Sequence, residues 1–104
     1  MIITTTESIP NADINEILDI VKGSTVRAKN SIKDLVASVR NMVGGEINEY
    51  TQLQLQSREE ALQRMISDAK RLNADAIINV RFSTAMIMEG TAETLAYGTA
   101  VKLK

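Results

Sequence analysis

One stretch of the chain, residues 46–82, constrains the fold more than any other part of the sequence. Its first part, Glu46 to Leu72, carries apolar residues at helical spacing over its second half, which predicts a long amphipathic helix. Asn73 follows, and asparagine tolerates the left-handed conformation with which many helices end. Residues Ala76 to Phe82 are then mostly apolar, which predicts a buried strand. A helix that leads directly into a strand must fold back over the sheet which that strand joins.

Two strands are predicted before this stretch. Residues 2–6 are short and β-branched, which indicates an edge strand, and Pro10 and Asn11 mark a turn after it. Residues 14–26 predict a longer strand with apolar residues on both faces, and such a strand is expected to be covered on both sides. One predicted face holds Ile14, Leu18 and Ile20, and the other holds Ile17 and Val21.

The remaining segments complete the predicted architecture. Residues 28–44 carry an apolar stripe that ends at two glycines, so they predict a short helix which forms an αα-hairpin with the long one. Residues 76–84, extended by 85–88, and residues 91–103 predict two further strands. The order strand, strand, helix, helix, strand, strand predicts a single α+β domain over residues 1–104, with an antiparallel sheet that carries a short and a long helix on one face.

The last predicted strand has one face with almost no side chain. This face consists of Ala96, Gly98 and Ala100. One interpretation is a strand packed closely under a helix. The other is a tight contact between subunits of an oligomer, or the floor of a ligand groove.

Composition excludes several classes of function. The net charge is −1 and only three residues are aromatic, so neither a basic surface for nucleic acid nor a set of stacking platforms for bases is present. The chain has no cysteine, and its N-terminus has no basic region followed by an apolar stretch. No apolar run approaches the roughly 20 residues that cross a bilayer. We therefore expect a cytoplasmic protein that binds neither nucleic acid nor membranes.

The residue types that most catalysis and soft-metal binding require are missing. Without histidine or cysteine, the chain has no general acid–base group tuned to neutral pH, no thiol nucleophile and no soft-metal ligand except methionine. Met86 and Met88 alternate on a predicted strand and make only a weak copper(I) candidate. We therefore predict no enzyme activity, no cofactor and no metal site.

Several polar residues are candidates for a ligand site. Asn79 and Arg81 are predicted to share one face of an otherwise apolar strand, and polar groups on such a face need partners. Those partners are a neighbouring subunit or a small anionic ligand. The full set of ligand-binding candidates is Arg27, Asn30, Arg58, Asp75, Asn79, Arg81 and Thr99.

A series of short motifs along the chain resembles the YbjQ-like family of small bacterial and archaeal proteins, which are described as heavy-metal-binding. The matching residues are Gly23, Asn30, Asp34, Arg40, Val43-Gly44-Gly45, Tyr50, Arg58, Ala61, Ala69, Leu72, Ala74-Asp75-Ala76 and Gly98-Thr99-Ala100-Val101. The resemblance implies a fold like the dodecin subunit, with a curved sheet against helices, and assembly into a ring-like homopentamer. It brings no catalytic residues.

Together these patterns predict a non-enzymatic homo-oligomer that binds a small ligand or serves as a structural module. The alternative is a metal-binding protein, as the family description suggests. The apolar two-faced strand favours assembly because an oligomer covers such a surface by symmetry. The ring number of five comes from the resemblance alone.

Overall fold

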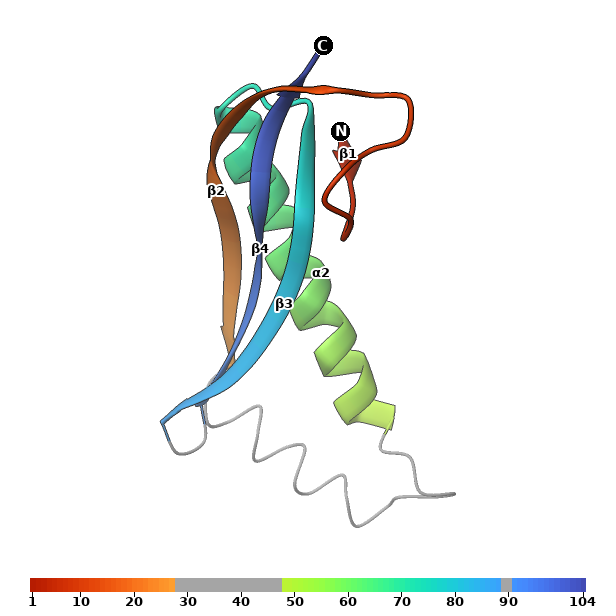
Figure 1. Cartoon of the computed structure of the whole chain (residues 1–104). Coiled ribbons are helices and arrows are strands. Elements are labelled where there is room, and N and C mark those ends of the chain that lie inside the picture. Colours follow the sequence, from red (N-terminus) through yellow and green to blue (C-terminus); the bar gives the residue numbers. More distant parts are fainter. Residues whose placement is uncertain (28–47, 89–90) are drawn as a thin grey trace.

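The computed structural model describes residues 1–27, 48–88 and 91–104. These residues form one four-stranded sheet in the order β1-β3-β4-β2, with a helix across one of its faces (Figure 1). Strand β1 runs parallel to β3, whereas β4 is antiparallel to both of its neighbours, β3 and β2. The elements are β1 Ile2–Ile3, β2 Ile14–Arg27, α2 Asn48–Arg71, β3 Ala76–Met88 and β4 Thr91–Leu103. The α+β class is confirmed.

The sheet is mixed and not purely antiparallel, because β1 lies beside β3 at the edge opposite to β2. The chain therefore crosses one end of the sheet between β1 and β2 (Figure 1). The predicted short helix, 28–44, and its αα-hairpin lie outside the described residues.

Helix α2 ends as the sequence predicts. Asn73 has a φ of 59°, and its N–H donates to the carbonyl of Lys70 at 3.0 Å. The N–H of Ala74 donates to the carbonyl of Ala69 at 3.1 Å. This pair of bonds is a Schellman motif, which satisfies carbonyls that the end of a helix leaves without partners. The chain then turns directly into β3.

The main core lies between α2 and the sheet. Ala61, Met65 and Ala69 form a fully buried stripe at four-residue spacing on α2 and pack against β2 and β4. Small side chains in this stripe bring the helix backbone close to the strands. Gly23 on β2 makes the closest approach, since a Cβ there would overlap with the backbone nitrogen of Met65 and the carbonyl oxygen of Ala61.

The small face of β4 belongs to this core. Ala96 and Ala100 have no exposed surface and pack in the cluster under α2. A Cβ on Gly98 would lie 2.7 Å from Cγ2 of Ile77. Ala96, Gly98 and Ala100 are thus covered by their own chain, which corrects the expectation that they form a contact between subunits. The interpretation as a strand packed closely under a helix is the one that the structure shows.

The face of the sheet opposite to α2, here called the outer face, is covered at one end only. Ala76, Ile78 and Val101 form a second buried cluster there, against Ile9, Ile14 and Leu103. Farther along β2, Ile17 is 69% exposed and Ile20 is 68% exposed. An antiparallel sheet normally presents polar residues on its open side, so these isoleucines form an apolar surface that no described residue covers.

The predicted faces of β2 are partly wrong. Leu18 and Val21 both pack against the core under α2, whereas Ile17 and Ile20 are both exposed. The reason is a pair of register shifts, between Ile14 and Glu16 and between Ile17 and Asp19. A bulge inserts one residue into the strand and exchanges the faces beyond it.

Candidate functional site

A bulge in β3 places two of the predicted ligand-binding residues at the edge of the sheet. The register against β4 shifts between Ile78 and Arg81, and Asn79 within this shift has a φ of 53°. A left-handed residue inside a strand is unfavourable, so the surroundings must hold it. The backbone N–H of Asn79 donates to the carbonyl of Thr6 at 3.0 Å. The shift also breaks the strict alternation that predicted Asn79 and Arg81 on one face.

The guanidinium of Arg81 is oriented by the N-terminal segment. Its Nη1 donates to the carbonyl of Thr5 at 2.9 Å and to the carbonyl of Val80 at 2.8 Å. Its Nε and Nη2 have no hydrogen-bond partner among the residues that the structure describes. Arg81 is exposed, and so is Asn79. The strand after the bulge therefore presents an exposed cation that two carbonyls hold in place and that keeps further donors available.

A row of side chains continues this site across the outer face. Tyr97 on β4 lies directly opposite Arg81, and Lys22 on β2 lies opposite Tyr97 on its other side. Tyr97 is 39% exposed. Thr99, another predicted site residue, is two positions along β4 on the same face and pairs with Ile78. We call Asn79, Arg81, Tyr97 and Thr99 the bulge site.

The chemistry of the bulge site favours an anion. An amide, a guanidinium, a phenol and a hydroxyl all donate hydrogen bonds, and the guanidinium is matched to carboxylate and phosphate. Within the described ranges, no carboxylate forms an ion pair with Arg81 or Lys22. Sequence reasoning assigned Tyr97 to an apolar face and did not predict that it pairs with Arg81. The available signal was its hydroxyl, a polar group on a face that otherwise reads as apolar.

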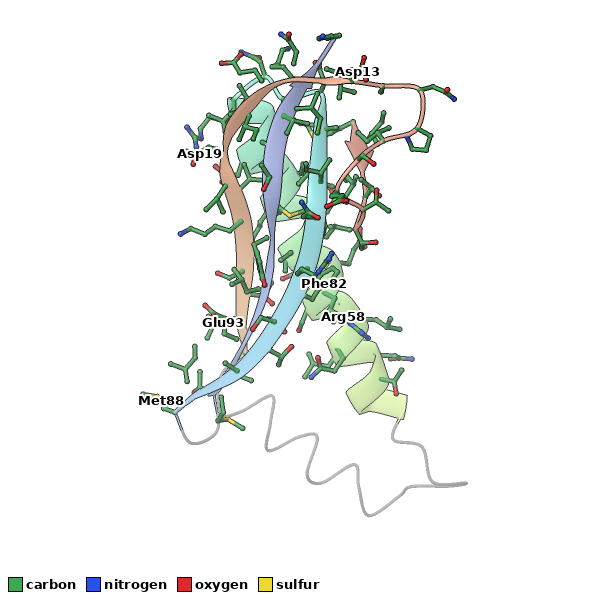
Figure 2. All side chains as sticks on the ribbon, viewed as in Figure 1. Asp13, Asp19, Arg58, Phe82, Met88 and Glu93 are labelled. Carbon is green, nitrogen blue, oxygen red and sulfur yellow. The ribbon has the colours of Figure 1, made fainter. Side chains whose placement is uncertain are left out.

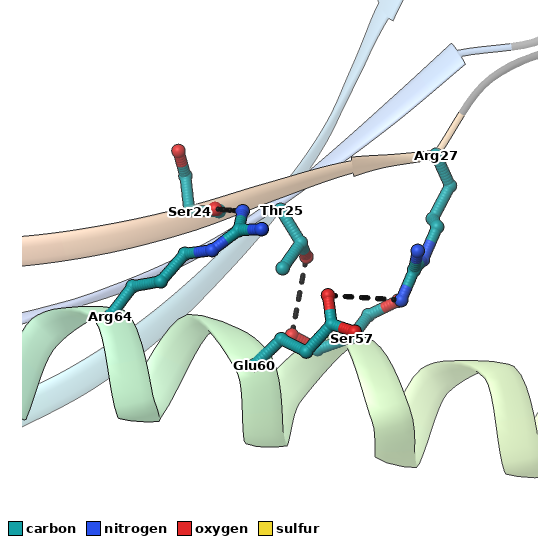
Figure 3. Close-up of polar contacts among 6 residues, drawn as sticks. All are labelled: Ser24, Thr25, Arg27, Ser57, Glu60 and Arg64. Atoms are coloured by element: carbon teal, nitrogen blue, oxygen red, sulfur yellow. Dashed lines mark hydrogen bonds and ion pairs between the residues drawn. The ribbon is translucent and has the colours of Figure 1, made fainter.

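Arg27 lies elsewhere and joins β2 to α2. Its Nε donates to Oγ of Ser57 at 3.1 Å, and it forms an ion pair with Glu60 at 3.3 Å (Figure 3). Oγ1 of Thr25 donates to the carbonyl of Ser57 at 3.2 Å, so strand and helix meet twice at one residue. These contacts explain Arg27 as a structural residue. They leave it outside the bulge site.

Asp75 also has a structural role. Its Oδ2 accepts the backbone N–H of Leu103 at 2.8 Å, and its Oδ1 lies 3.4 Å from Nζ of Lys102. The Leu103 N–H, aided by the charge of Lys102, holds the pKa of this carboxyl below its usual range. The side chain thereby ties the start of β3 to the end of β4.

The other two candidates do not join the site. Arg58 is exposed on α2, where its Nε donates to the carbonyl of Gln54 in the same helix at 3.3 Å (Figure 2). Asn30 lies outside the described residues. Of the seven predicted residues, Arg81 and Thr99 share one face of the sheet, and Asn79 lies in the bulge between Ile78 and Arg81.

The described residues hold no group of three or more acidic side chains that could bind a metal ion. Met65 is fully buried in the core, as its helical spacing predicts. Met86 and Met88 lie on the far part of β3, with a register shift between them. Two thioethers without a thiolate or imidazole make a poor site for a soft metal.

Comparison with known proteins settles the family. The model of the YbjQ family, described as "Putative heavy-metal-binding", matches residues 1–104. The chain belongs to the YbjQ family. A UPF0145 protein of Archaeoglobus fulgidus is 57% identical over 104 residues, which are 100% of this chain and 96% of that protein. A UPF0145 protein of Thermus thermophilus is 47% identical over 100% of this chain and 91% of its own.

A solved structure shows that the YbjQ fold recurs in a more distant protein. The crystal structure of a protein of unknown function from the DUF74 family of Pediococcus pentosaceus matches with a TM-score of 0.68. It covers 100% of this YbjQ chain and 98% of that chain, at 23% identity. This structural similarity shows that the two proteins share a fold, and it assigns no activity to either of them.

Two other expectations concern enzyme activity and membrane spans. The names of the relatives contain no enzyme activity. Among the described residues of this YbjQ chain, no helix is both long and apolar enough to cross a membrane.

Proposed function

We propose that this chain is a non-enzymatic, cytoplasmic, homo-oligomeric module that holds a small anion at the bulge site. The observation that carries the proposal is Arg81, whose guanidinium is fixed by two backbone carbonyls while Nε and Nη2 have no partner among the described residues. A donor group that is already oriented loses little conformational freedom when it binds, which favours recognition of a carboxylate or phosphate.

The outer face supports both parts of the proposal, the assembly of several copies and the anion site. Ile17 and Ile20 offer an apolar surface to a second copy, and Lys22 and Arg81 lie in a row within the same face. Burial of a cation requires a negative partner. A small anion meets this requirement, and the ring of five copies that the family resemblance suggests would repeat the site in every subunit.

Calorimetric titration with inorganic phosphate and with citrate tests the anion site. Arg81→Gln and Tyr97→Phe are expected to weaken binding about tenfold or more, through loss of the guanidinium and of the phenol hydroxyl. Arg58→Gln is the matched control, because it makes the same charge change on α2 and is expected to bind like the wild type. Equal weakening in Arg81→Gln and Arg58→Gln, or no binding by the wild type, would refute the site.

Native mass spectrometry tests the assembly. The proposal expects a closed oligomer of five copies, with retained mass if the anion stays bound. Ile20→Glu places a charge on the outer face and is expected to shift the oligomer to smaller species. Lys104→Glu, at an exposed position at the end of the chain, is the control. A wild-type monomer at micromolar concentration would overturn this part of the proposal.

A further inference from the structure

Three side chains from three different strands form a single row across the outer face. Arg81 on β3 lies directly opposite Tyr97 on β4, and Tyr97 lies directly opposite Lys22 on β2. Residues that pair directly across neighbouring strands point to the same face of a sheet. All three are exposed. We call Arg81, Tyr97 and Lys22 the cation row, because in it a phenol separates two cations.

The neighbours of the cation row in the sequence show which way it points. Val80, Ala96 and Val21 belong to the core under α2, and each of them precedes one member of the row. Because successive side chains on a strand alternate between the two faces of a sheet, the cation row points away from α2. The outer face therefore presents both cations to solvent.

The strands set the separation of the two cations. Neighbouring strands lie about 4.8 Å apart, so the backbones of Arg81 and Lys22 are about 10 Å apart, with Tyr97 midway. The guanidinium of Arg81 is turned farther from Lys22, because its Nη1 donates to the carbonyl of Thr5 on the opposite side of β3. A ligand that contacts both cations therefore needs a charged group at each of its two ends.

The free part of the Arg81 guanidinium matches a carboxylate. Its Nη1 is used by the carbonyls of Thr5 at 2.9 Å and Val80 at 2.8 Å. Nε and Nη2, which have no partner among the described residues, direct one N–H each to the same side of the guanidinium. Two parallel donors of this kind bind the two oxygens of one carboxylate in a plane. A phosphate would bring a third oxygen that this pair of donors leaves without a partner.

Lys22 supplies a second cation that the described chain leaves available. Within residues 1–27, 48–88 and 91–104, its ammonium has no hydrogen-bond or ion-pair partner. Asp68 accepts the backbone N–H of Lys22 at 3.3 Å, but its carboxylate forms an ion pair with Arg71 at 2.9 Å. The hydrogen bond from Arg71 lowers the pKa of Asp68 most, and the side-chain charge of Lys22 lowers it least. The charge of Asp68 is therefore engaged by Arg71.

The rows on either side of the cation row carry no charge. One row consists of Ile78, Thr99 and Ile20, and the other consists of Ser83, Leu95 and Ser24. Glu93, the acidic residue of β4, is four positions from Tyr97 and about 13 Å away along the strand (Figure 2). The ring of Tyr97 and the side chain of Leu95 give the centre of this surface an apolar character. A ligand with charged ends and a hydrocarbon middle is complementary to it.

We infer that the bulge site takes a small linear dicarboxylate. One carboxylate binds Nε and Nη2 of Arg81, the other binds the ammonium of Lys22, and the methylene chain between them lies over the ring of Tyr97. The inference rests on the proposed anion site and names the class of its ligand. Once one end is bound, the second contact forms within a single complex at high effective concentration, which favours a dianion over a monoanion of equal length.

Calorimetric titration of the full chain with adipate and with adipate monoamide tests the inference. The two ligands have the same length and differ by one charge. We expect adipate to bind about fivefold more tightly, the factor that one exposed ion pair supplies at most. Malonate is too short to span the row, so we expect it to bind no more tightly than its own monoamide. Equal binding of adipate and its monoamide by the wild type would overturn the inference.

Lys22→Gln separates the two ends of the ligand. It is expected to reduce the ratio of the adipate affinity to the monoamide affinity to about one, through loss of the second ion pair. Lys104→Gln makes the same charge change at an exposed position at the end of the chain and should keep the wild-type ratio. A preference for adipate that persists in Lys22→Gln would overturn the inference. Tighter binding of butanediphosphonate than of adipate would overturn the assignment to carboxylates.

The outcomes separate this inference from the proposed function. If phosphate and citrate bind the wild type but bind Arg81→Gln weakly, while adipate has no advantage over its monoamide, the anion site stands and the dicarboxylate assignment fails. If the wild type binds none of phosphate, citrate and adipate, both proposals fail. If the adipate preference is lost in Lys22→Gln and kept in Lys104→Gln, the assignment is supported.

Discussion

Gly23 on β2 and Met65 on α2 touch backbone to backbone. A Cβ at position 23 would overlap with the nitrogen of Met65, and it would also meet the carbonyl oxygen of Ala61. The glycine is required here by the close approach of the helix. The contact fixes the depth at which α2 lies on the sheet and therefore the packing of the whole core.

We expect Gly23→Ala to destabilise the chain by about 1–3 kcal/mol, because the added methyl group forces the helix and strand apart. Urea denaturation of both proteins at one concentration measures the difference. Ser24→Ala, at the neighbouring position, is the control, because Ser24 uses its carbonyl and not its side chain to contact Arg64. Equal stability of wild type and Gly23→Ala would contradict the close approach.

The left-handed conformation of Asn73 leads to a second prediction. Asn73→Val should lower stability by roughly 1–2 kcal/mol, since a β-branched residue is strained at a φ of 59°. Asn73→Gly should be neutral or slightly stabilising, because glycine adopts this conformation without strain. Thermal unfolding of the two variants provides the test, and an equal loss in both would show that the Asn73 side chain, and not its backbone, matters.

The carboxylate of Asp75 predicts a dependence of stability on pH. Because the Leu103 N–H and the charge of Lys102 lower its pKa in the folded state, the ionised form stabilises the fold. This contribution is fully present above the unfolded pKa of about 3.9 and is lost as the pH falls through the lower folded pKa. Asp75→Ala should therefore be less stable than the wild type at pH 7.

In denaturation measurements, the difference between wild type and Asp75→Ala should shrink as the pH falls below about 4, because the unfolded chain is protonated there first, and it should vanish only below the lowered pKa of the folded carboxylate. Asp13→Ala is a suitable control, since the contact of Asp13 with Lys104 uses its backbone carbonyl. A gap that stays constant from pH 7 to pH 3 would mean that Asp75 acts through packing and not through its charge.

The contact between Arg27 and Ser57 predicts a coupling energy. Ser57→Ala removes the acceptor of the 3.1 Å bond from Nε of Arg27, and we expect a loss of about 0.5–1.5 kcal/mol. A double-mutant cycle with Arg27→Met measures the coupling directly. Additive losses would show that the two side chains stabilise the seam between β2 and α2 independently.

Local sequence signals predicted the elements well. The helix is predicted to end at Leu72 and ends at Arg71, and the strands 76–88 and 91–103 agree with β3 and β4. These predictions succeed because spacing, helix stops and turn residues act over a few neighbouring positions. The predicted turn at Pro10 and Asn11 is present for the same reason, with Asn11 at a φ of 62°.

Non-local pairing was not predictable in the same way. The position of β1 parallel to β3 depends on contacts between residues more than 70 positions apart. The bulges at Leu18 and Asn79 shift the register by one residue and so change the face that later side chains occupy. Strict alternation therefore misplaced Ile17 and Ile20, and it concealed the position of Tyr97 opposite Arg81.

The sequence by itself determined the helix, the strands, the end of α2 at Asn73 and the absence of histidine and cysteine chemistry. Only the tertiary structure decided which polar residues lie together, with Arg81 opposite Tyr97 and near Thr99, and with Arg27 and Asp75 in contacts between elements. It also decided that the small face of β4 lies under α2. The physical reason is that elements follow from local spacing, whereas register and bulges follow from packing between distant segments.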